Sequence, residues 1–351
     1  MILGLYMYIY ENLSFVQFEF SNVWVAIIGF IVFDFLFYWS HRWGHEWNVM
    51  WGAHIVHHQS KEFNLSVALR QSWFHNLLMF WFFFPMVLFG LHPMMLVLIV
   101  AVSTLAQYWI HTKFIGKLSK WIELIFNTPS HHRVHHATNK HYLDKNYGAV
   151  FIIWDRIFGT FEEEQEEVVF GITAPYESND ATWANVHFYT EMWEGMKRER
   201  SLKDKIALLF KGPDYLGALV PELYEKKEVI ESVKPKMKWT NYYVLMQFIL
   251  LNLGMIFYMQ SFDQLHISYQ WFFVGLIVLT TFTLGALLSN SNNVWHWEII
   301  RLVVAGAVIS YLYYTQFSFW FYFVVGISFV VIAVSNVLYF GYVRRQFLQV
   351  N

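Results

Sequence analysis

Residues 23–45 read VWVAIIGFIVFDFLFYWSHRWGH, an apolar run that ends in two histidines. The part 23–40 approaches the roughly 20 apolar residues that a helix needs to cross the hydrocarbon core of a bilayer. His41 and His45 follow at a spacing of four, which places both imidazoles on one face of the same helix. The stretch therefore predicts a transmembrane helix that carries two imidazoles to the membrane surface.

The composition extends this prediction to the whole chain. Of 351 residues, 56% are hydrophobic and only 14% are charged, whereas a soluble domain carries about 25% charged residues. A net charge of -2 excludes a broad basic face for nucleic acid. Apolar runs that could cross a bilayer lie at 23–40, 73–91, 93–110, 242–259, 271–289, 299–315 and 318–340. The predicted fold class is an all-α, multi-pass membrane helical bundle of about seven spans.

The basic residues fall on one side of this topology. Lys and Arg are absent from residues 1–21, from the Leu91–Pro93 turn, from the Gln260–Gln270 loop and from the Thr315–Ser318 turn. All 24 belong to the opposite side, which is cytoplasmic by the positive-inside rule. The polar stretch 111–240 would then form a cytoplasmic helical cap, and the N-terminus would lie outside.

The chain is expected to divide into four segments: an N-terminal segment (1–22), a membrane domain that carries the histidines and the cap (23–220), a linker (221–241) and a C-terminal four-span membrane region (242–345). The active site would lie on the cytoplasmic face of its membrane. The host membrane, bacterial inner membrane or endoplasmic reticulum, stays open at this point.

Two segments of the cap have the pattern of helices that lie in the membrane interface. Ile115–Phe126 carries apolar side chains such as Trp121 on one helical face, with charged ones such as Lys117 and Glu123 opposite. Ser201–Lys211 repeats the pattern. Amphipathic helices of this kind bury their apolar face at the boundary between headgroups and acyl chains.

Most of the 16 histidines occur in clusters: HRWGH from His41, HIVHH from His54 and HHRVHH from His131. His111 ends the third span, with Gln107 four residues earlier on the same face. Spacings of three and four let imidazoles reach one metal ion. A zinc site needs three or four protein ligands, so this many histidines indicates two ions. Zinc, copper and iron all bind imidazole, whereas the lack of cysteine excludes iron–sulfur clusters.

Asp34 lies inside the first span, on the same face as His41 and His45. Two roles are open: it could orient a metal-binding imidazole through its second nitrogen, or hydrogen-bond a neighbouring helix. Other polar groups beside the clusters would either support the ligands or cap helices: Glu46, Asn64, Arg70 and Asn127. The isolated histidines are interpreted as structural: His75, His92, His187, His266 and His296. His141 is ambiguous, and the acidic run Glu162–Glu167 is interpreted as a solvated turn.

The stretches HRWGH, HIVHH, NTPSHHRVHH and KNYGAVFIIWDRIFGTF resemble the fatty acid hydroxylase and sterol desaturase superfamily. Softer motifs, WGAHIVHHQSKEFNLSVALRQS, QYWIHT and FKGPDYLG, are similar to its alkylglycerol monooxygenase branch. The likeness covers about 20–220 closely. It implies a set of metal ligands, with His131 and Gln107 as possible additions: His41, His45, His54, His57, His58, His111, His132, His135 and His136.

The resemblance also implies a reaction. The superfamily uses two iron ions and molecular oxygen to hydroxylate a C–H bond of a membrane lipid. The alkylglycerol branch oxidises the ether-linked carbon, takes electrons from tetrahydrobiopterin and releases a fatty aldehyde. Asp34 and Glu46 would then act in catalysis only as partners that orient ligands. The chain has no Gly-rich dinucleotide loop, so tetrahydrobiopterin or another external electron donor is required.

Two alternatives accompany this hypothesis. The protein could be a sterol, sphingolipid or carotenoid hydroxylase or desaturase of the same superfamily. It could also be a non-catalytic metal-binding or transport protein of the membrane. Transport would place ionisable residues through the middle of several spans, whereas the candidate ligands here gather at one face. The expected partners are a membrane lipid and a reductant, and the oligomeric state stays open.

Overall fold

The computed structural model describes residues 2–174, 176, 178, 180–224, 238–289 and 294–316. Within these residues the chain is helical, and its only extended pairings are isolated bridges between Phe126 and Phe151 and between Ala137 and Phe170. The prediction of an all-α protein is therefore confirmed for the described part. The chain divides into two compact units, 1–176 with 185–227, and 177–184 with 228–351.

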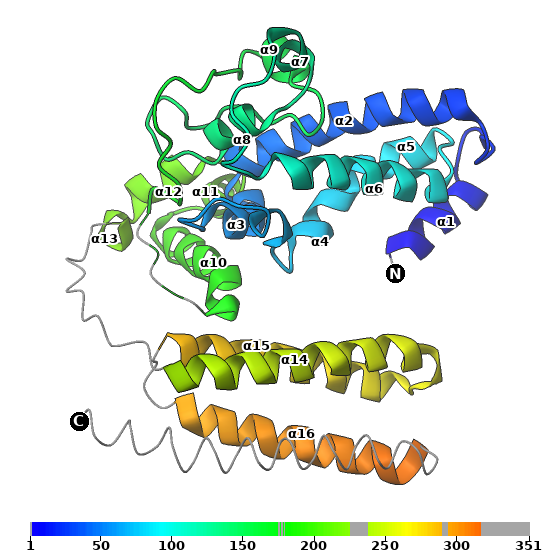
Figure 1. Ribbon diagram of the computed structural model, residues 1–351, viewed down its shortest axis with the longest axis vertical. Coiled ribbons are helices and arrows are strands. Elements are labelled where there is room, and N and C mark those ends of the chain that lie inside the picture. The colour runs from blue at the N-terminus through cyan, green and yellow to red at the C-terminus, as the bar shows by residue number, and fades with distance from the viewer. Residues whose placement is uncertain are drawn as a thin grey trace. The chain divides into compact units, whose positions relative to one another are not determined.

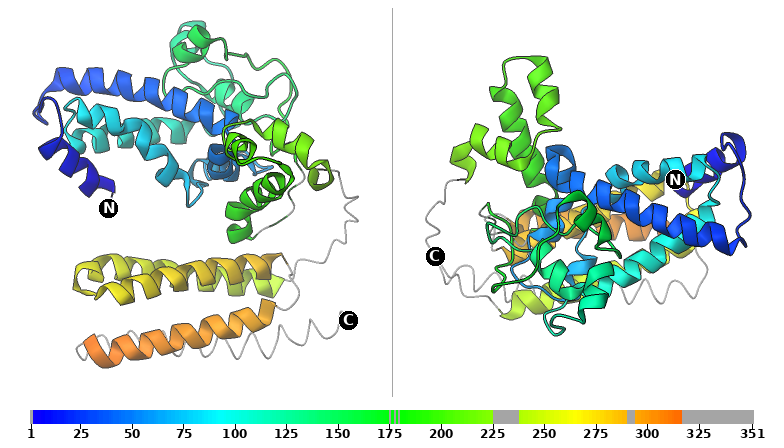
Figure 2. Two further views of the ribbon diagram at one scale, coloured as in Figure 1. Left: turned by 180° about the vertical axis from the view of Figure 1, so that it is seen from behind. Right: turned by 90° about the horizontal axis from the view of Figure 1, so that it is seen from above.

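Two long helices of the first unit, α2 (Val23–Glu46) and α6 (Pro93–Ile110), run side by side (Figures 1 and 2). They approach closely at Gly29, where a β-carbon would lie 3.0 Å from Leu91 Cδ1 and 3.2 Å from Ile99 Cδ1. The missing side chain at Gly29 thus sets the distance between the helices. The same contact places Gly29 of α2 level with Ile99 of α6.

The stretch 73–91, predicted as one regular span, is a broken helix. It consists of α4 (His75–Met79), the 3-10 segment η2 (Phe80–Phe83) and α5 (Phe84–Leu88). Pro85 stands in the first turn of α5. Proline has no N–H to continue the helical ladder, and its ring crowds the preceding turn. The chain therefore crosses this region as short pieces.

The first helix, α1 (Ile2–Asn12), packs against α5. The chain after it hydrogen-bonds to the end of α5, from Phe15 N to Leu88 O (2.9 Å) and from Phe18 N to Gly90 O (3.0 Å). Gly90 has a φ of 100°, which only glycine adopts without strain. The N-terminal residues and the turn before α6 therefore lie at one end of the unit, which agrees with their assignment to the same side of the membrane.

Four helices are long and apolar enough to cross a membrane: Val23–Glu46, Pro93–Ile110, Thr240–Gln260 and Ile267–Leu288. The broken stretch His75–Leu88 is shorter. The predicted span 299–315 lies within a helix of the second unit, and the predicted span 318–340 lies outside the described residues. In the part of the chain that is described, the hydropathy pattern thus overstates the number of regular spans.

Shorter helices complete the first unit, and only the first residues of α10, 181–184, are assigned to the second. They are α3 (Asn48–His58), η1 (Val67–Leu69), α7 (Lys120–Ile125), α8 (Pro129–His135), α9 (Ile153–Phe158), α10 (Ala181–Arg198), α11 (Leu202–Leu208), α12 (Pro213–Leu219) and α13 (Pro221–Tyr224). Buried apolar side chains hold α3 against the later helices, among them Ile55, Val56, Phe188 and Leu208. Of the predicted amphipathic helix 115–126, the structure has α7 over the second half.

The second unit contains α14 (Lys238–Ser261), η3 (Phe262–Gln264), α15 (Ile267–Leu288) and α16 (Val294–Gln316). Glu298 and Arg301 form a buried ion pair on α16, with Arg301 Nε donating to Glu298 Oε2 at 2.8 Å. Tyr243 also donates to Glu298, and Arg301 donates to Gln247 Oε1 at 3.0 Å. Arg301, which the charge pattern assigns to the cytoplasmic side, is thus neutralised inside a helix bundle.

Replacing Arg301 with Ala should destabilise α14–α16 by about 3 kcal/mol, because the fully buried Glu298 carboxylate loses its counter-ion. The chain has no cysteine, so Thr283→Cys, at a fully buried position, can report unfolding through its reaction with a thiol dye. The dye should react at a lower temperature in the Arg301→Ala background. The paired change Glu298→Gln with Arg301→Gln should recover most of the loss; equal curves for all variants would contradict the prediction.

Candidate metal centre

The histidine clusters meet at one end of α2 and α6. His41 and His45 occupy the last turns of α2, and the chain reverses at Trp47 into α3, which carries the second cluster. His111 stands directly after the last residue of α6. Helix α8 begins at Pro129 and supplies the third cluster, and the side chain of Thr128 before it accepts a hydrogen bond from His131 N. Four segments distant in sequence thus converge.

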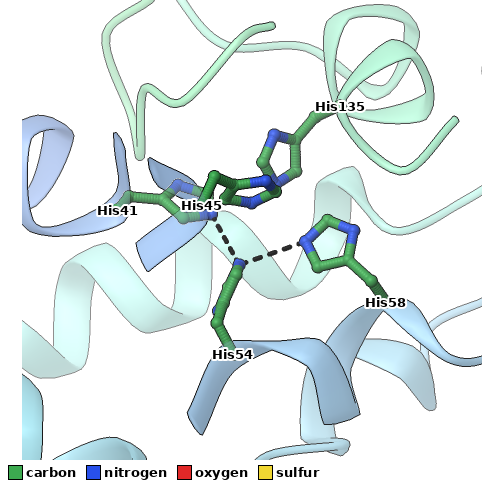
Figure 3. A group of neighbouring side chains, drawn as sticks. All are labelled: His41, His45, His54, His58 and His135. Carbon is green, nitrogen blue, oxygen red and sulfur yellow. Dashed lines mark hydrogen bonds between the residues drawn. The ribbon is translucent and has the colours of Figure 1, made fainter. Parts of the chain in front are cut away.

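Five buried histidines form the first group, which we call group one: His41, His45, His54, His58 and His135. One nitrogen of each lies within 4.8 Å of the corresponding nitrogen of every other member. His54 Nε2 lies 2.9 Å from His41 Nε2 and 3.1 Å from His58 Nε2 (Figure 3). The rings point inward from three helices toward one small volume.

Four buried histidines form the second group, called group two: His57, His111, His132 and His136. His111 Nε2 lies 3.2 Å from His57 Nε2 and 2.8 Å from His132 Nε2, and His136 Nε2 lies 3.2 Å from His132 Nε2. Group two adjoins group one, since the rings of His58 and His136 stack with centroids 4.3 Å apart. Together the groups contain all nine histidines of the predicted ligand set.

The electrostatics of the groups fit metal cations. Burial and neighbouring imidazoles hold the pKa of His58 and His136 well below its usual value, so these rings are in the neutral form that binds metal. Among the described residues, His45 Nε2 and His135 Nε2 have no hydrogen-bond partner. Facing nitrogens 2.8–3.2 Å apart are close enough for one ion to bind both at a metal–nitrogen distance of about 2.1 Å.

Backbone carbonyls orient four of the rings through the nitrogen that faces away from the group. The contacts are His41 Nδ1 to Tyr147 O (2.7 Å), His57 Nδ1 to Val67 O (3.1 Å), His111 Nδ1 to Gln107 O (2.7 Å) and His135 Nδ1 to Lys145 O (2.9 Å). A proton held at Nδ1 leaves the Nε2 lone pair free for a metal. This is the usual support of a metal-binding histidine.

The chain after the third cluster is held by a carboxylate that the sequence motifs do not single out. Asp155 accepts hydrogen bonds from Tyr147 N (2.7 Å), Gly148 N (2.8 Å) and Thr160 Oγ1 (2.7 Å). A β-carbon at Gly148 would lie 2.4 Å from Phe151 O, so the turn requires glycine. The available signal was an acidic residue within the apolar run IIWDRIF, because a buried charge needs several partners.

Asp34 does not contact an imidazole. It is fully buried and accepts hydrogen bonds from Val150 N (2.9 Å), Phe151 N (3.2 Å) and Trp154 Nε1 (2.9 Å). Of the two roles left open by the sequence, the contacts favour the bond to a neighbouring segment over the orientation of a ligand. The physical reason is that the three N–H donors hold both carboxylate oxygens on the side of α2 that faces α9.

The other predicted polar residues hold the backbone beside the groups. Glu46 pairs with Arg42 (2.8 Å) and does not touch an imidazole. Arg70 Nε donates to Val56 O at 2.7 Å, at the end of α3, and Asn127 Nδ2 donates to Gly148 O at 2.5 Å. Asn64 accepts from Ser66 within its own turn. These contacts support the backbone and caps.

The two possible additional ligands lie outside both groups. Gln107 turns its side-chain amide to Ser103 Oγ (3.1 Å), and only its backbone carbonyl contacts His111. His131 is buried with its ring against Phe161. The imidazole of His75, by contrast, is less isolated than the sequence indicated, with its ring centroid 6.0 Å from that of His54.

The acidic run is more than a solvated turn. Glu164 accepts from Arg133 at 2.7 and 2.6 Å, through both carboxylate oxygens. Arg133 stands between two histidines of α8 and also donates to Thr112 O (3.0 Å) and Ile115 O (2.7 Å). The guanidinium therefore ties α8 to the chain that follows α6. Sequence reasoning missed this pair because its members lie far apart along the chain.

Comparison with known proteins adds the family. Residues 26–160 match the family model described as fatty acid hydroxylase. The alkylglycerol monooxygenase of Homo sapiens is 35% identical over 310 residues, which cover 85% of this chain and 68% of the human protein. The chain belongs to the alkylglycerol monooxygenase family. The relative from Danio rerio is 33% identical over 313 residues, covering 86% of this chain and 69% of its own.

A more distant relative of this alkylglycerol monooxygenase family member is also named for an activity on a lipid. An ornithine lipid hydroxylase of Rhizobium tropici is 30% identical over 146 residues, which cover 39% of this chain and 41% of that protein. No solved structure matches the chain. The region matched by the family model contains all members of groups one and two, so the histidine geometry and the family membership concern the same residues.

Replacing Asp155 with Ala should weaken metal binding about 10- to 100-fold while every histidine remains, because Tyr147 loses the contact that positions its carbonyl for His41. Titration of the metal against a competing chelator measures the change. Asp214→Ala, at an exposed position of α12, is the matched control. Equal affinities in the two variants would contradict the role of Asp155.

Proposed function

We propose that this protein is a membrane monooxygenase that hydroxylates a lipid C–H bond at a centre of two iron ions. The observation that carries the proposal is the pair of buried histidine groups, which contain five and four residues and lie at one end of α2 and α6. Family membership supports it, because the relatives over most of the chain are named monooxygenases. A structural site would not need two adjoining groups of this size.

The histidines have distinct tasks in this proposal. Group one would hold one ion and group two the other, with the nine imidazoles as ligands and neither His131 nor Gln107 among them. Iron ions bound there would supply the activation of molecular oxygen that oxidation of an unactivated C–H bond requires. The chain itself keeps its imidazoles neutral, fixes their rings through backbone carbonyls and excludes bulk water by burial.

We propose a 1-O-alkylglycerol lipid as the substrate, from the names of the relatives. One atom of molecular oxygen enters the C–H bond next to the ether oxygen and gives a hemiacetal. The other atom leaves as water, with two electrons and two protons from a reductant. The hemiacetal C–O bond then breaks, its hydroxyl proton passes to the glycerol oxygen, and a fatty aldehyde and a glycerol derivative separate.

The two electrons must come from outside the chain. The protein contains no cysteine that could hold an iron–sulfur cluster. We propose a reductant that diffuses to the site, with tetrahydrobiopterin as the first choice. The distribution of basic residues supports a cytoplasmic position for the histidine end, where a soluble donor would be accessible. In this scheme 23–220 is the catalytic part, and 242–345 is a separate membrane region.

Removing one ligand from each group should separate the two ions. His58→Ala and His136→Ala should each lower bound metal from about two ions per chain to about one, since each group supplies its own set of nitrogens. Metal analysis after anaerobic purification makes the measurement. His141→Ala is the control, because that side chain is half exposed and pairs with Glu166. Full metal content in both group variants would contradict the assignment.

The reaction is tested by incubating the reduced protein in lipid with alkylglycerol, oxygen and tetrahydrobiopterin. The expected product is a fatty aldehyde with the complete alkyl chain, detected by mass spectrometry, and His57→Ala and His135→Ala should reduce it to background. If the same preparation leaves the ether lipid intact but oxidises a sterol, a ceramide or a carotenoid, the monooxygenase function stands and the proposed substrate is wrong.

A further inference from the structure

An apolar surface is exposed on α7, on α9 and on the chain that leads to α7. We call this surface the wedge and define it by residues 114–126 and 153–158. Phe114 is 100% exposed, Trp121 79% and Ile157 61%. The two helices lie next to each other, joined by the bridge between Phe126 and Phe151 (Figure 1). Apolar surface of this extent marks a contact with a partner or with a membrane.

The wedge lies beside the middle of α2. Asp34, close to the centre of the helix Val23–Glu46, accepts hydrogen bonds from the backbone of residues 150 and 151 and from the indole of Trp154. The ring of Trp154 packs on Phe35 with centroids 5.2 Å apart, and Phe158 packs on Trp39 at 5.0 Å. α9 therefore follows the second half of a candidate membrane span.

The depth of this contact follows from the packing of α2 on α6. Gly29 of α2 faces Ile99 of α6, and both helices run in the same direction from that contact, so Asp34 is level with the middle of α6. The last turns of α6 expose Leu105 (59%) and Trp109 (58%). The wedge begins at Phe114, five residues after Trp109 along the chain.

The backbone where the two parts of the wedge meet is satisfied by protein groups. Its irregular chain could remain in hydrocarbon only where protein groups satisfy its N–H and C=O groups. Asn127 N donates to Val150 O (2.8 Å) and Ile152 N to Ile125 O (3.0 Å), while the Asp34 carboxylate accepts from the two intervening N–H groups. A carboxylate inside a span is thereby explained by the donors it satisfies.

Two basic side chains of the wedge, those of Arg156 and Lys117, contact other groups of the protein, while Lys120 is exposed. The Arg156 guanidinium lies 3.6 Å from the centre of the Phe161 ring and donates to Glu123 O at 3.1 Å. Lys117 lies 3.7 Å from Glu163. Long basic side chains can keep their charged ends at the membrane surface while their stems cover apolar surface.

We propose that the wedge inserts side-on into the bilayer leaflet at the histidine end of the protein, where α7 and α9 contact lipid acyl chains. The occupant of the surface is the hydrocarbon of that leaflet, because the surface begins a few residues after the exposed end of α6 and packs on the middle of α2, a candidate membrane span. α7 thus reaches deeper than an interface helix, and α9 joins it. The competing arrangement has the second half of α2 outside the bilayer, with the wedge in water.

Because the chain contains no cysteine, single nitroxide labels can measure depth. Trp121→Cys and Ile157→Cys place labels on the wedge. Ile28→Cys, at a 61% exposed position of α2, is the membrane control, and Lys140→Cys, at an exposed position after α8, is the water control. The ratio of spin relaxation by oxygen to relaxation by a water-soluble nickel chelate is recorded in reconstituted bilayers.

Both wedge labels should give a ratio several-fold above that of Lys140→Cys and close to that of Ile28→Cys, because oxygen concentrates in hydrocarbon and the chelate does not. A ratio equal to that of Lys140→Cys at either wedge position overturns the proposal. Metal content equal to that of the parent protein shows that each labelled variant is folded. The readout does not depend on activity, so it is independent of the substrate.

Discussion

Nine imidazoles can share one buried volume only if they stay uncharged, because charged rings at these distances would repel one another. The pairs of nitrogens 2.8–3.2 Å apart would repel through their lone pairs without a proton or a cation between them. The neighbouring backbone meets this requirement for four of the rings. Carbonyls fix the outward nitrogens of His41, His57, His111 and His135, so the inward nitrogens are left for metal.

Two buried carboxylates connect this centre to the membrane helices. Asp155 holds the backbone of Tyr147, whose carbonyl orients His41. Asp34 holds the same segment a few residues later, at Val150 and Phe151. The short stretch between these contacts is therefore fixed at both ends, once to the metal centre and once to the middle of α2. A shift of either carboxylate would therefore move the backbone that orients the imidazole of His41.

The sequence could group the nine histidines because their spacing is local. Residues three or four apart on a helix must face the same way, and that rule already grouped His54 with His58 and His132 with His136. The partners of Asp34 could not be predicted in the same way, since Val150 is 116 positions later and no spacing rule links the two. The break before Pro85 was missed because hydropathy measures apolarity and not the ability to continue a helix.

The position of the centre in the membrane depends on rigid elements. His41 and His45 belong to α2, His111 follows α6 directly, and the contact at Gly29 fixes the register of the two helices. A lipid with its headgroup at the surface presents each carbon of its chain at a characteristic depth. A centre on two packed helices holds its own depth more closely than one on loops would. Such a centre can select one carbon by depth, without recognising a group at that carbon.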